Sequence, residues 1–245
     1  MVTLNQGRAL RTLALAATAA VLAVQIPDVV AVAGTPSVNG YAGIDYELYM
    51  NATRSWIDTG DFYEPHQLAG PYQIHDGDIL YPPTALWLFV PSTFLPAVLW
   101  WIVPLLLTAW SIWRLRPGPL ARPLMALCLW GPVQIHIISG NPGIWAMAAV
   151  ALGTVYRWPS VFALVKPSLG PFALFGMRDR RWWLTLAALV VLSAPLLPMW
   201  FDWVRVVANS RGGGLLYSWQ EAPMMLLPIL AWFARPGGRY DIERR

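Results

Sequence analysis

The chain has little charge and almost no cysteine. Charged residues make up 12% of its 245 positions, whereas soluble domains average about 25%. Cys128 is the single cysteine, which excludes an intrachain disulfide and a cysteine metal site. The basic residues are dispersed at the ends of apolar runs. This argues against a phosphate-reading nucleic-acid surface, despite a pI near 9.5.

Apolar and aromatic residues dominate instead. Hydrophobic residues form 57% of the chain, which also holds 15 Trp and 22 Pro. Trp favours membrane interfaces, and Pro is commoner in membrane helices than in soluble ones. We therefore predict an all-α fold, a polytopic transmembrane helical bundle that forms one integral membrane domain over residues 1–245.

The N-terminal run 12–32 follows Arg8 and Arg11. It reaches the roughly 20 residues that a membrane helix needs. Ala31-Val-Ala33 before Gly34 offers an alternative, a signal-peptidase site. On either reading the chain from residue 34 begins outside, and we expect an uncleaved helix.

Acidic residues gather directly after this run. Eight of the 13 lie between positions 28 and 78, and segment 33–83 contains one basic residue, Arg54. We predict that 33–83 is an outer loop that carries the active site. Within it, Tyr46, Tyr49 and Trp56 recur at helical spacing, which indicates an amphipathic helix over 45–58 that Gly60 ends.

The remaining apolar runs are divided by prolines and flanked by arginines. With the first span they predict about six crossings and cytoplasmic termini, because basic residues mark inner ends. A short helix at 84–95 should precede the crossings, which we place at 97–113, 123–138, 144–156, 184–200 and 222–234.

Segment 157–178 differs from these runs. Its pieces 159–165 and 168–177 are too short to span, Lys166-Pro167 separates them, and arginines stand at both ends. We predict a re-entrant hairpin with Lys166, the only lysine, near its tip. An ionisable residue inside a membrane indicates function. Its partner should be a carboxylate of the outer loop or a lipid phosphate, unless the lysine lies in a cytoplasmic loop.

Two groups of side chains have the chemistry of a site. Asp45 can act as a general base, or it can simply cap the outer helix, where Asp is favoured. His75-Asp76-Gly-Asp78 is a weak metal motif. Its oxygen ligands would suit Mg²⁺ or Mn²⁺ better than Zn²⁺, and we expect no cofactor.

An ordered set of phrases resembles the bacterial polytopic glycosyltransferases of the GT-C superfamily. The closest group uses polyprenyl-phosphate sugars and includes phosphatidylinositol-mannoside mannosyltransferases. The resemblance covers roughly residues 8–230. Its phrases are Asp45 with Tyr49, Gly60 and Tyr63; 81–89 with Pro91 and Pro96; Gly140-Asn-Pro-Gly143; Ala163-Leu-Val-Lys-Pro167 before Arg178; and Ser218-Trp-Gln220.

The resemblance implies an inverting enzyme in the bacterial cell membrane. It would move a sugar, mannose or a similar hexose, from a polyprenyl phosphate to an acceptor hydroxyl on a lipid or glycan at the outer face. Asp45 matches the catalytic aspartate. Lys166, Arg205 and Arg211 are candidates for binding the donor phosphate. The substrate-binding candidates are Tyr49, His75, Asp76, Tyr81, Asn141 and Gln220.

Two other functions stay open at this stage. The first is a non-catalytic membrane subunit that binds a lipid-linked sugar. The second is a small-solute transporter with Lys166 as a coupling charge. Many transporters show inverted repeats, and none is visible in the sequence.

Overall fold

The computed structural model describes residues 4–33, 42–75, 77–211 and 221–236. About 78% is helical with almost no strand, which confirms the all-α prediction. The longer helices are α1 (Leu4–Ala33), α2 (Ile44–Thr59), α4 (Leu86–Thr93), α5 (Leu99–Leu115), α6 (Ala121–Leu127), α7 (Gly131–Ser139), α8 (Gly143–Tyr156), α10 (Arg180–Ser193), α11 (Leu197–Asn209) and α12 (Ala222–Phe233).

Short elements complete the chain. The helical turns are α3 (Pro65–Ala69), η1 (Pro83–Ala85), η2 (Trp158–Val165), η3 (Pro167–Leu169), α9 (Gly170–Ala173), η4 (Leu174–Gly176) and η5 (Ala194–Leu196). Strands β1 (Tyr72–Gln73) and β2 (Ser210–Arg211) pair in parallel, with Tyr72 opposite Ser210. This small pairing fixes the end of α11 beside the loop after α3.

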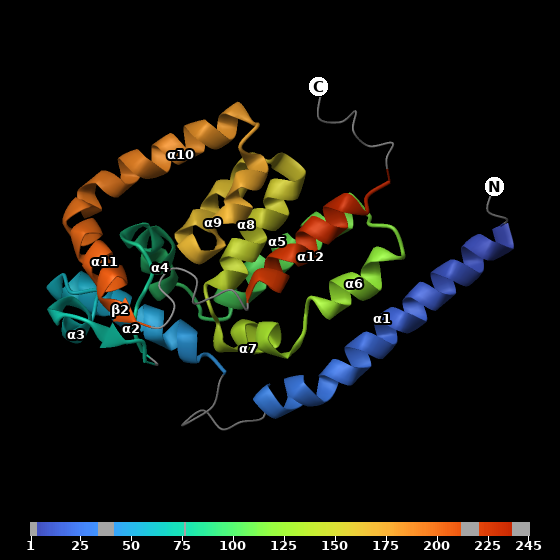
Figure 1. Ribbon diagram of the computed structural model, residues 1–245, viewed down its shortest axis with the longest axis horizontal. Helices are drawn as coiled ribbons and strands as arrows, with labels where there is room; N and C mark the ends of the chain where they lie inside the picture. Colours follow the sequence, from blue (N-terminus) through green and yellow to red (C-terminus); the bar gives the residue numbers. More distant parts are fainter. Residues whose placement is uncertain (1–3, 34–41, 76, 212–220, 237–245) are drawn as a thin grey trace.

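Helices α5, α8 and α12 form the centre, and α1 lies at the edge along α6 and α7 (Figure 1). Helices α10 and α11 form an arc over the opposite edge. The core between them is aromatic and sulphur-rich; Tyr81, Phe89, Met147 and Met224 are all at most 2% exposed. The α8 helix is buried along most of its length, so it is the element on which the others are assembled.

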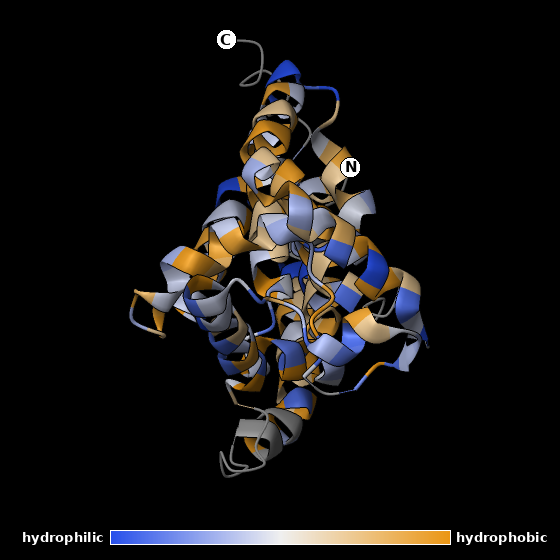
Figure 2. Ribbon diagram, turned by 90° about the vertical axis from the view of Figure 1, so that its left-hand side faces the viewer, coloured by the Kyte–Doolittle hydropathy of each residue, from blue (hydrophilic) through white to orange (hydrophobic). Residues whose placement is uncertain are grey.

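The outer helices expose their apolar side chains. Val24 on α1 is 78% exposed and Val191 on α10 is 70% exposed. Figure 2 shows hydrophobic residues along the helices at the surface as well as inside. Large exposed apolar surfaces mark contact with lipid or protein, so membrane association follows from this arrangement.

Fewer spans are present than the sequence predicted. Within the described residues, Arg8–Pro27 and the continuous stretch Arg180–Asn209 are long and apolar enough to cross a membrane. A third span results if α7 and α8, which are bent by 107°, are taken together. The six predicted crossings are therefore not supported.

Two predicted crossings are wrong for local reasons. Segment 123–138 is broken into α6 and α7, because Trp130 is extended and Gly131-Pro132 starts a new helix. The predicted end at residue 200 is also wrong. After the turn η5, Pro198 lies in the first turn of α11, where proline is tolerated, and the helix continues to Asn209.

Other boundaries are confirmed. Helix α2 matches the predicted 45–58, and Gly60 ends it with φ 89°. The prolines do divide 84–113 into α4 and α5. Segment 158–176 forms short turns in place of one helix, and Arg157 and Arg178 line the same cavity. The chain therefore reverses between them, as the predicted hairpin requires.

Candidate functional site

Asp45 lies in the first turn of α2, against the junction of α7 and α8. Its Oδ2 atom accepts a hydrogen bond from Ser139 Oγ at 2.7 Å and another from Asn141 Nδ2 at 3.0 Å. The side chain is half-buried. Among the described residues, Oδ1 receives no hydrogen bond, so it can accept one from a ligand hydroxyl.

Two glycines bring these elements together. Gly43 precedes α2 with φ 78°, and its amide donates to Ile138 O at 3.0 Å. Gly140 ends α7 with φ 77°. A Cβ there would lie 2.7 Å from the Trp101 ring and 2.8 Å from Tyr46 Cβ. Only glycine fits this close left-handed turn, and the turn aims Ser139 and Asn141 at Asp45.

Asn141 connects Asp45 to Lys166. Its Oδ1 atom accepts from the Lys166 ammonium at 2.9 Å and from the Gly143 amide at 2.9 Å. An ammonium has only donors, so the carboxamide oxygen must face Lys166 and its NH₂ must face Asp45. The orientation of the amide therefore follows from the charges on either side.

Lys166 is 1% exposed and forms an ion pair with Glu221, which is also 1% exposed. Its ammonium donates to Glu221 Oε1 at 2.5 Å. A buried charge needs such a partner, because desolvation of an isolated ion costs several kcal/mol. The predicted partners were a carboxylate of loop 33–83 or a lipid phosphate. Among the described residues, the carboxylate that pairs with Lys166 is instead that of Glu221, directly before α12.

Glu221 itself depends on a glycine. A Cβ at position 143 would collide with Glu221 Oε2, so Gly143 makes room for the carboxylate. Oε2 is buried and has no hydrogen-bond donor among the described residues. His136 Nδ1 lies 3.9 Å from Oε1. This end of the molecule thus holds a second carboxylate oxygen that can accept a hydrogen bond.

Aromatic rings enclose the network. Tyr81 OH lies 3.4 Å from Asn141 Oδ1, and the Lys166 ammonium lies 5.3 Å from the centre of the Tyr81 ring. Tyr49 packs edge-on against Tyr81 and stacks on Phe89. Such packing excludes water and fixes the polar groups, which strengthens their electrostatic interactions.

Of the residues predicted for the site, Asp45, Asn141, Tyr81 and Lys166 share one hydrogen-bonded cluster, with Tyr49 packed beside it. The arginines do not join it directly. Arg205 is exposed and lies 3.5 Å from Asp202, and Arg211 is exposed on β2. Asp76 and Gln220 lie outside the described residues.

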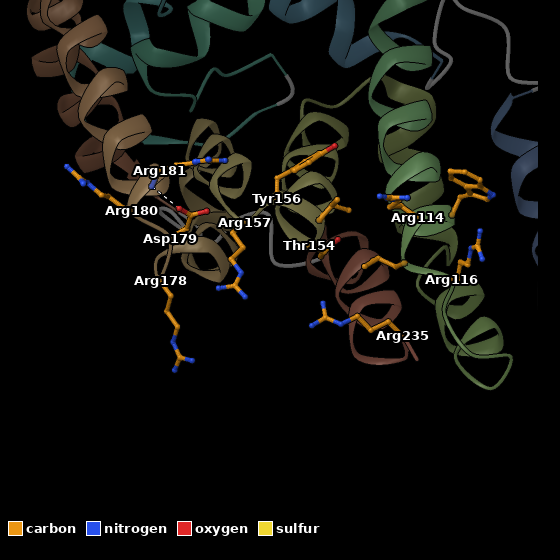
Figure 3. Close-up of a pocket in the computed structure, with 13 residues that line it drawn as sticks. Arg114, Arg116, Thr154, Tyr156, Arg157, Arg178, Asp179, Arg180, Arg181 and Arg235 are labelled. Atoms are coloured by element: carbon orange, nitrogen blue, oxygen red, sulfur yellow. Dashed lines mark hydrogen bonds between the residues drawn. The ribbon is translucent and has the colours of Figure 1, made fainter. Parts of the chain in front are cut away.

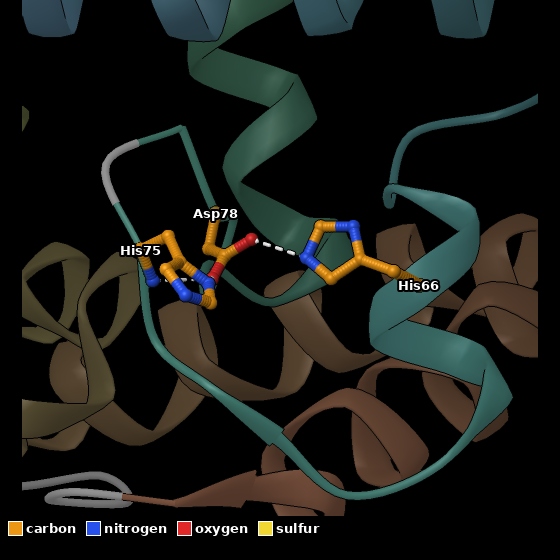
Figure 4. Close-up of side chains that lie close together, drawn as sticks. All are labelled: His66, His75 and Asp78. Carbon is orange, nitrogen blue, oxygen red and sulfur yellow. Dashed lines mark hydrogen bonds and ion pairs between the residues drawn. The ribbon is translucent and has the colours of Figure 1, made fainter.

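His75 belongs to a separate group of ligand-type side chains, with His66 and Asp78 (Figure 4). His66 Nε2 lies 2.8 Å from Asp78 Oδ1, and His75 Nδ1 lies 4.0 Å from Oδ2. One atom of each residue falls within 4.8 Å of the others. Two imidazoles and a carboxylate suit zinc better than the Mg²⁺ or Mn²⁺ that the sequence motif favoured. The same contacts also hold the loop without a metal.

Sequence reasoning missed Glu221 and Ser139 as members of the cluster. A single signal for each was present. Glu221 is an acid directly before an apolar helix, and Ser139 precedes the Gly-Asn-Pro-Gly turn. Glu221 is separated from Lys166 by 55 positions in the sequence, and Ser139 from Asp45 by 94. Local sequence patterns do not predict contacts between residues so far apart in the chain.

Comparisons with protein-family models, curated proteins and solved structures found no match for this chain.

Proposed function

We propose that the protein is a membrane glycosyltransferase that moves a hexose from a polyprenyl phosphate to an acceptor hydroxyl, with Asp45 as the general base. One observation carries the proposal. The Asp45 carboxylate is fixed through Oδ2 by Ser139 and Asn141, while no described residue donates to Oδ1. A half-buried carboxylate with one fixed and one available oxygen suits removal of a proton from a bound hydroxyl.

The proposed reaction is a single displacement. The acceptor oxygen forms a bond to the anomeric carbon as its proton passes to Asp45 Oδ1. The bond to the phosphate oxygen breaks, and its electrons leave with the polyprenyl phosphate. Attack from the face opposite the leaving group inverts the anomeric centre. The proton of the acceptor hydroxyl is taken up by the Asp45 carboxylate, so the proposed step does not require a metal ion to remove it.

The arginine at one end of α8 supports an orientation in the membrane. Asn141 precedes the helix, and Arg157 follows it. At about 1.5 Å per residue, the 14 residues of α8 span roughly 21 Å. Arginines favour the cytoplasmic side, so we place the Asp45 end outside and both termini inside, in a bacterial cell membrane.

Lys166 has a more precise role in this proposal than the sequence allowed. Its ammonium holds Asn141 Oδ1 and Glu221 Oε1, so it orients the amide that fixes Asp45. It also places a positive charge near the reacting groups, where it would stabilise the departing phosphate. Arg211, which is exposed and lies opposite Gln73 of β1, is a further candidate for donor binding.

A second function is favoured by one contact. Glu221 already neutralises Lys166, as expected if the pair is structural and the protein only binds a lipid-linked sugar. A transfer assay separates the two functions. Purified protein would be mixed with radiolabelled polyprenyl-phosphate mannose and a panel of lipid and glycan acceptors. Transfer by wild type that is lost in Asp45→Asn supports the enzyme; donor binding without transfer to any acceptor supports the binding subunit.

A further inference from the structure

Seven arginines line one cavity (Figure 3). It lies at the Arg157 end of α8, whereas Asn141, which contacts Asp45, lies at the other end. The volume of the cavity is about 750 Å³. Arg114 and Arg116 come from the end of α5, Arg157 from the end of α8, Arg235 from beyond α12, and three more from segment 178–181. Four chain segments that are distant in sequence thus bring their positive charges to one place.

The cavity has a strong excess of positive charge. Among the described residues that line it, seven are arginines and one, Asp179, is acidic. The Asp179 carboxylate also accepts a hydrogen bond from the Arg181 amide at 2.9 Å and caps α10. Guanidinium groups match phosphate oxygens by paired hydrogen bonds, which makes a phosphate-bearing anion the ligand that this lining fits.

Backbone conformation gives a second, independent reason. Of the described residues other than glycine, only Arg116 and Arg157 have positive φ, and both line this cavity. Arg157 has φ 65° and ψ −61°, a strained γ-turn conformation that is rare for residues with a Cβ. Glycine would adopt it without this strain. The position carries an arginine instead, which indicates that the guanidinium has a function in the cavity.

The surrounding contacts hold Arg157 in this conformation. Its amide donates to Gly153 O at 2.8 Å, and its carbonyl accepts from Ser160 N at 3.2 Å and Ser160 Oγ at 2.9 Å. A Cβ at Gly176 would collide with the same carbonyl. The strain is therefore built in by packing from η2 and η4, and it fixes where the Arg157 side chain leaves the backbone.

We propose that this cavity is a binding site for a multiply charged phosphate anion, separate from the Asp45 site. Phosphate oxygens of this kind are offered by the headgroup of an anionic phospholipid and by a soluble di- or polyphosphate. Helix ends at the cytoplasmic side commonly use such basic pockets for lipid headgroups. The inference does not depend on glycosyl transfer, because it uses none of the residues around Asp45.

The test is a binding titration of the purified full-length protein in neutral detergent, monitored by calorimetry. One arm uses inorganic pyrophosphate, and the other uses micelles doped with phosphatidic acid, with phosphatidylcholine as the reference lipid. Arg157→Gly removes the guanidinium at a position whose backbone suits glycine, so folding should be preserved. Arg178→Gln makes a second test without touching the strained residue. Arg54→Gln, an exposed arginine on α2, is the matched control.

We expect saturable binding by wild type and the control, with affinity lowered at least tenfold in Arg157→Gly and Arg178→Gln and weakened by salt. Stronger binding of phosphatidic acid than of pyrophosphate identifies a lipid headgroup as the ligand. The reverse order identifies a soluble polyphosphate. The proposal is overturned if neither ligand binds saturably, or if both cavity variants bind as wild type does.

Discussion

The Lys166 ammonium donates to Glu221 Oε1 at 2.5 Å, although 55 positions separate the two residues in the chain. The contact joins the break between η2 and η3 to the start of α12. Because Lys166 also holds Asn141, the pair determines how the Asp45 carboxylate is presented.

Asp45→Asn should abolish most of the proposed transfer. The amide keeps the shape of the side chain but cannot accept the proton, and a general base contributes about 10²–10⁴-fold. We expect transfer to fall by about 10²-fold or more, with donor binding and thermal stability retained. Asp58→Asn, on the exposed end of α2, is the control. Turnover in Asp45→Asn equal to that of wild type would refute the base assignment.

The Lys166–Glu221 pair should show strong coupling in a double-mutant cycle. Lys166→Met leaves a buried carboxylate without its cation, and Glu221→Leu leaves a buried ammonium without its anion. Loss of one partner of a buried pair costs about 3–5 kcal/mol. The double variant Lys166→Met/Glu221→Leu should recover much of this stability without recovering transfer. Additive losses in thermal unfolding would show that the two charges do not interact.

Tyr63 should make stability fall at alkaline pH. Burial, with a smaller effect of the Asp202 carboxylate, raises the pKa of Tyr63 far above its ordinary value of 10.0. Below pH 10 both states keep the proton. Above it the unfolded chain loses the proton while the folded protein retains it, so unfolding becomes more favourable as the pH rises.

Tyr63→Phe removes this titration and the hydrogen bond to Tyr81 O at 2.9 Å. We expect a loss of about 1 kcal/mol at neutral pH and a shallower decline between pH 10 and 11.5. Thermal unfolding across this range measures both effects, with Tyr156→Phe as the exposed control. Parallel declines in wild type and Tyr63→Phe would contradict the assignment.

Removal of metal should leave the proposed transfer unchanged. The Lys166 ammonium is connected to Asp45 through Asn141, and the candidate ligands His66, His75 and Asp78 lie apart from them, in α3 and the loop that follows it. Assays before and after treatment with EDTA test this point. If EDTA abolishes transfer and Zn²⁺ restores it in wild type but not in Asp78→Asn, the loop is part of the active site.

Local patterns predicted the elements whose causes are local. Helical spacing located α2, Gly60 located its end, and prolines located the division between α4 and α5. The same reasoning failed where one residue type is compatible with two structures, as proline is at helix boundaries. The crossing predicted over 184–200 ended shortly after Pro198, yet proline suits the first turn of a new helix, and α11 continues to Asn209.

The cluster was predictable only in part, because its members meet through tertiary contacts. Lys166 was recognisable as the only lysine, placed inside the membrane, and Asp45 as an acid of the outer loop, whereas Asn141 and Tyr81 were named through the family resemblance. Their arrangement depends on the path of segment 158–176 back along α8, and Glu221 was not distinguished from an ordinary loop acid. Burial of the partner charge becomes visible only once Gly143 and α12 are placed in space.

The carboxamide of Asn141 has a consequence for where protons can travel. It transmits polarisation from the ammonium to Asp45, but an amide nitrogen does not release its hydrogen at ordinary pH. A proton that arrives on Asp45 therefore has no route through Asn141 to Glu221. The half-buried Asp45 carboxylate and the buried Glu221 carboxylate therefore influence each other through charge and polarisation, but they do not exchange protons through the amide between them.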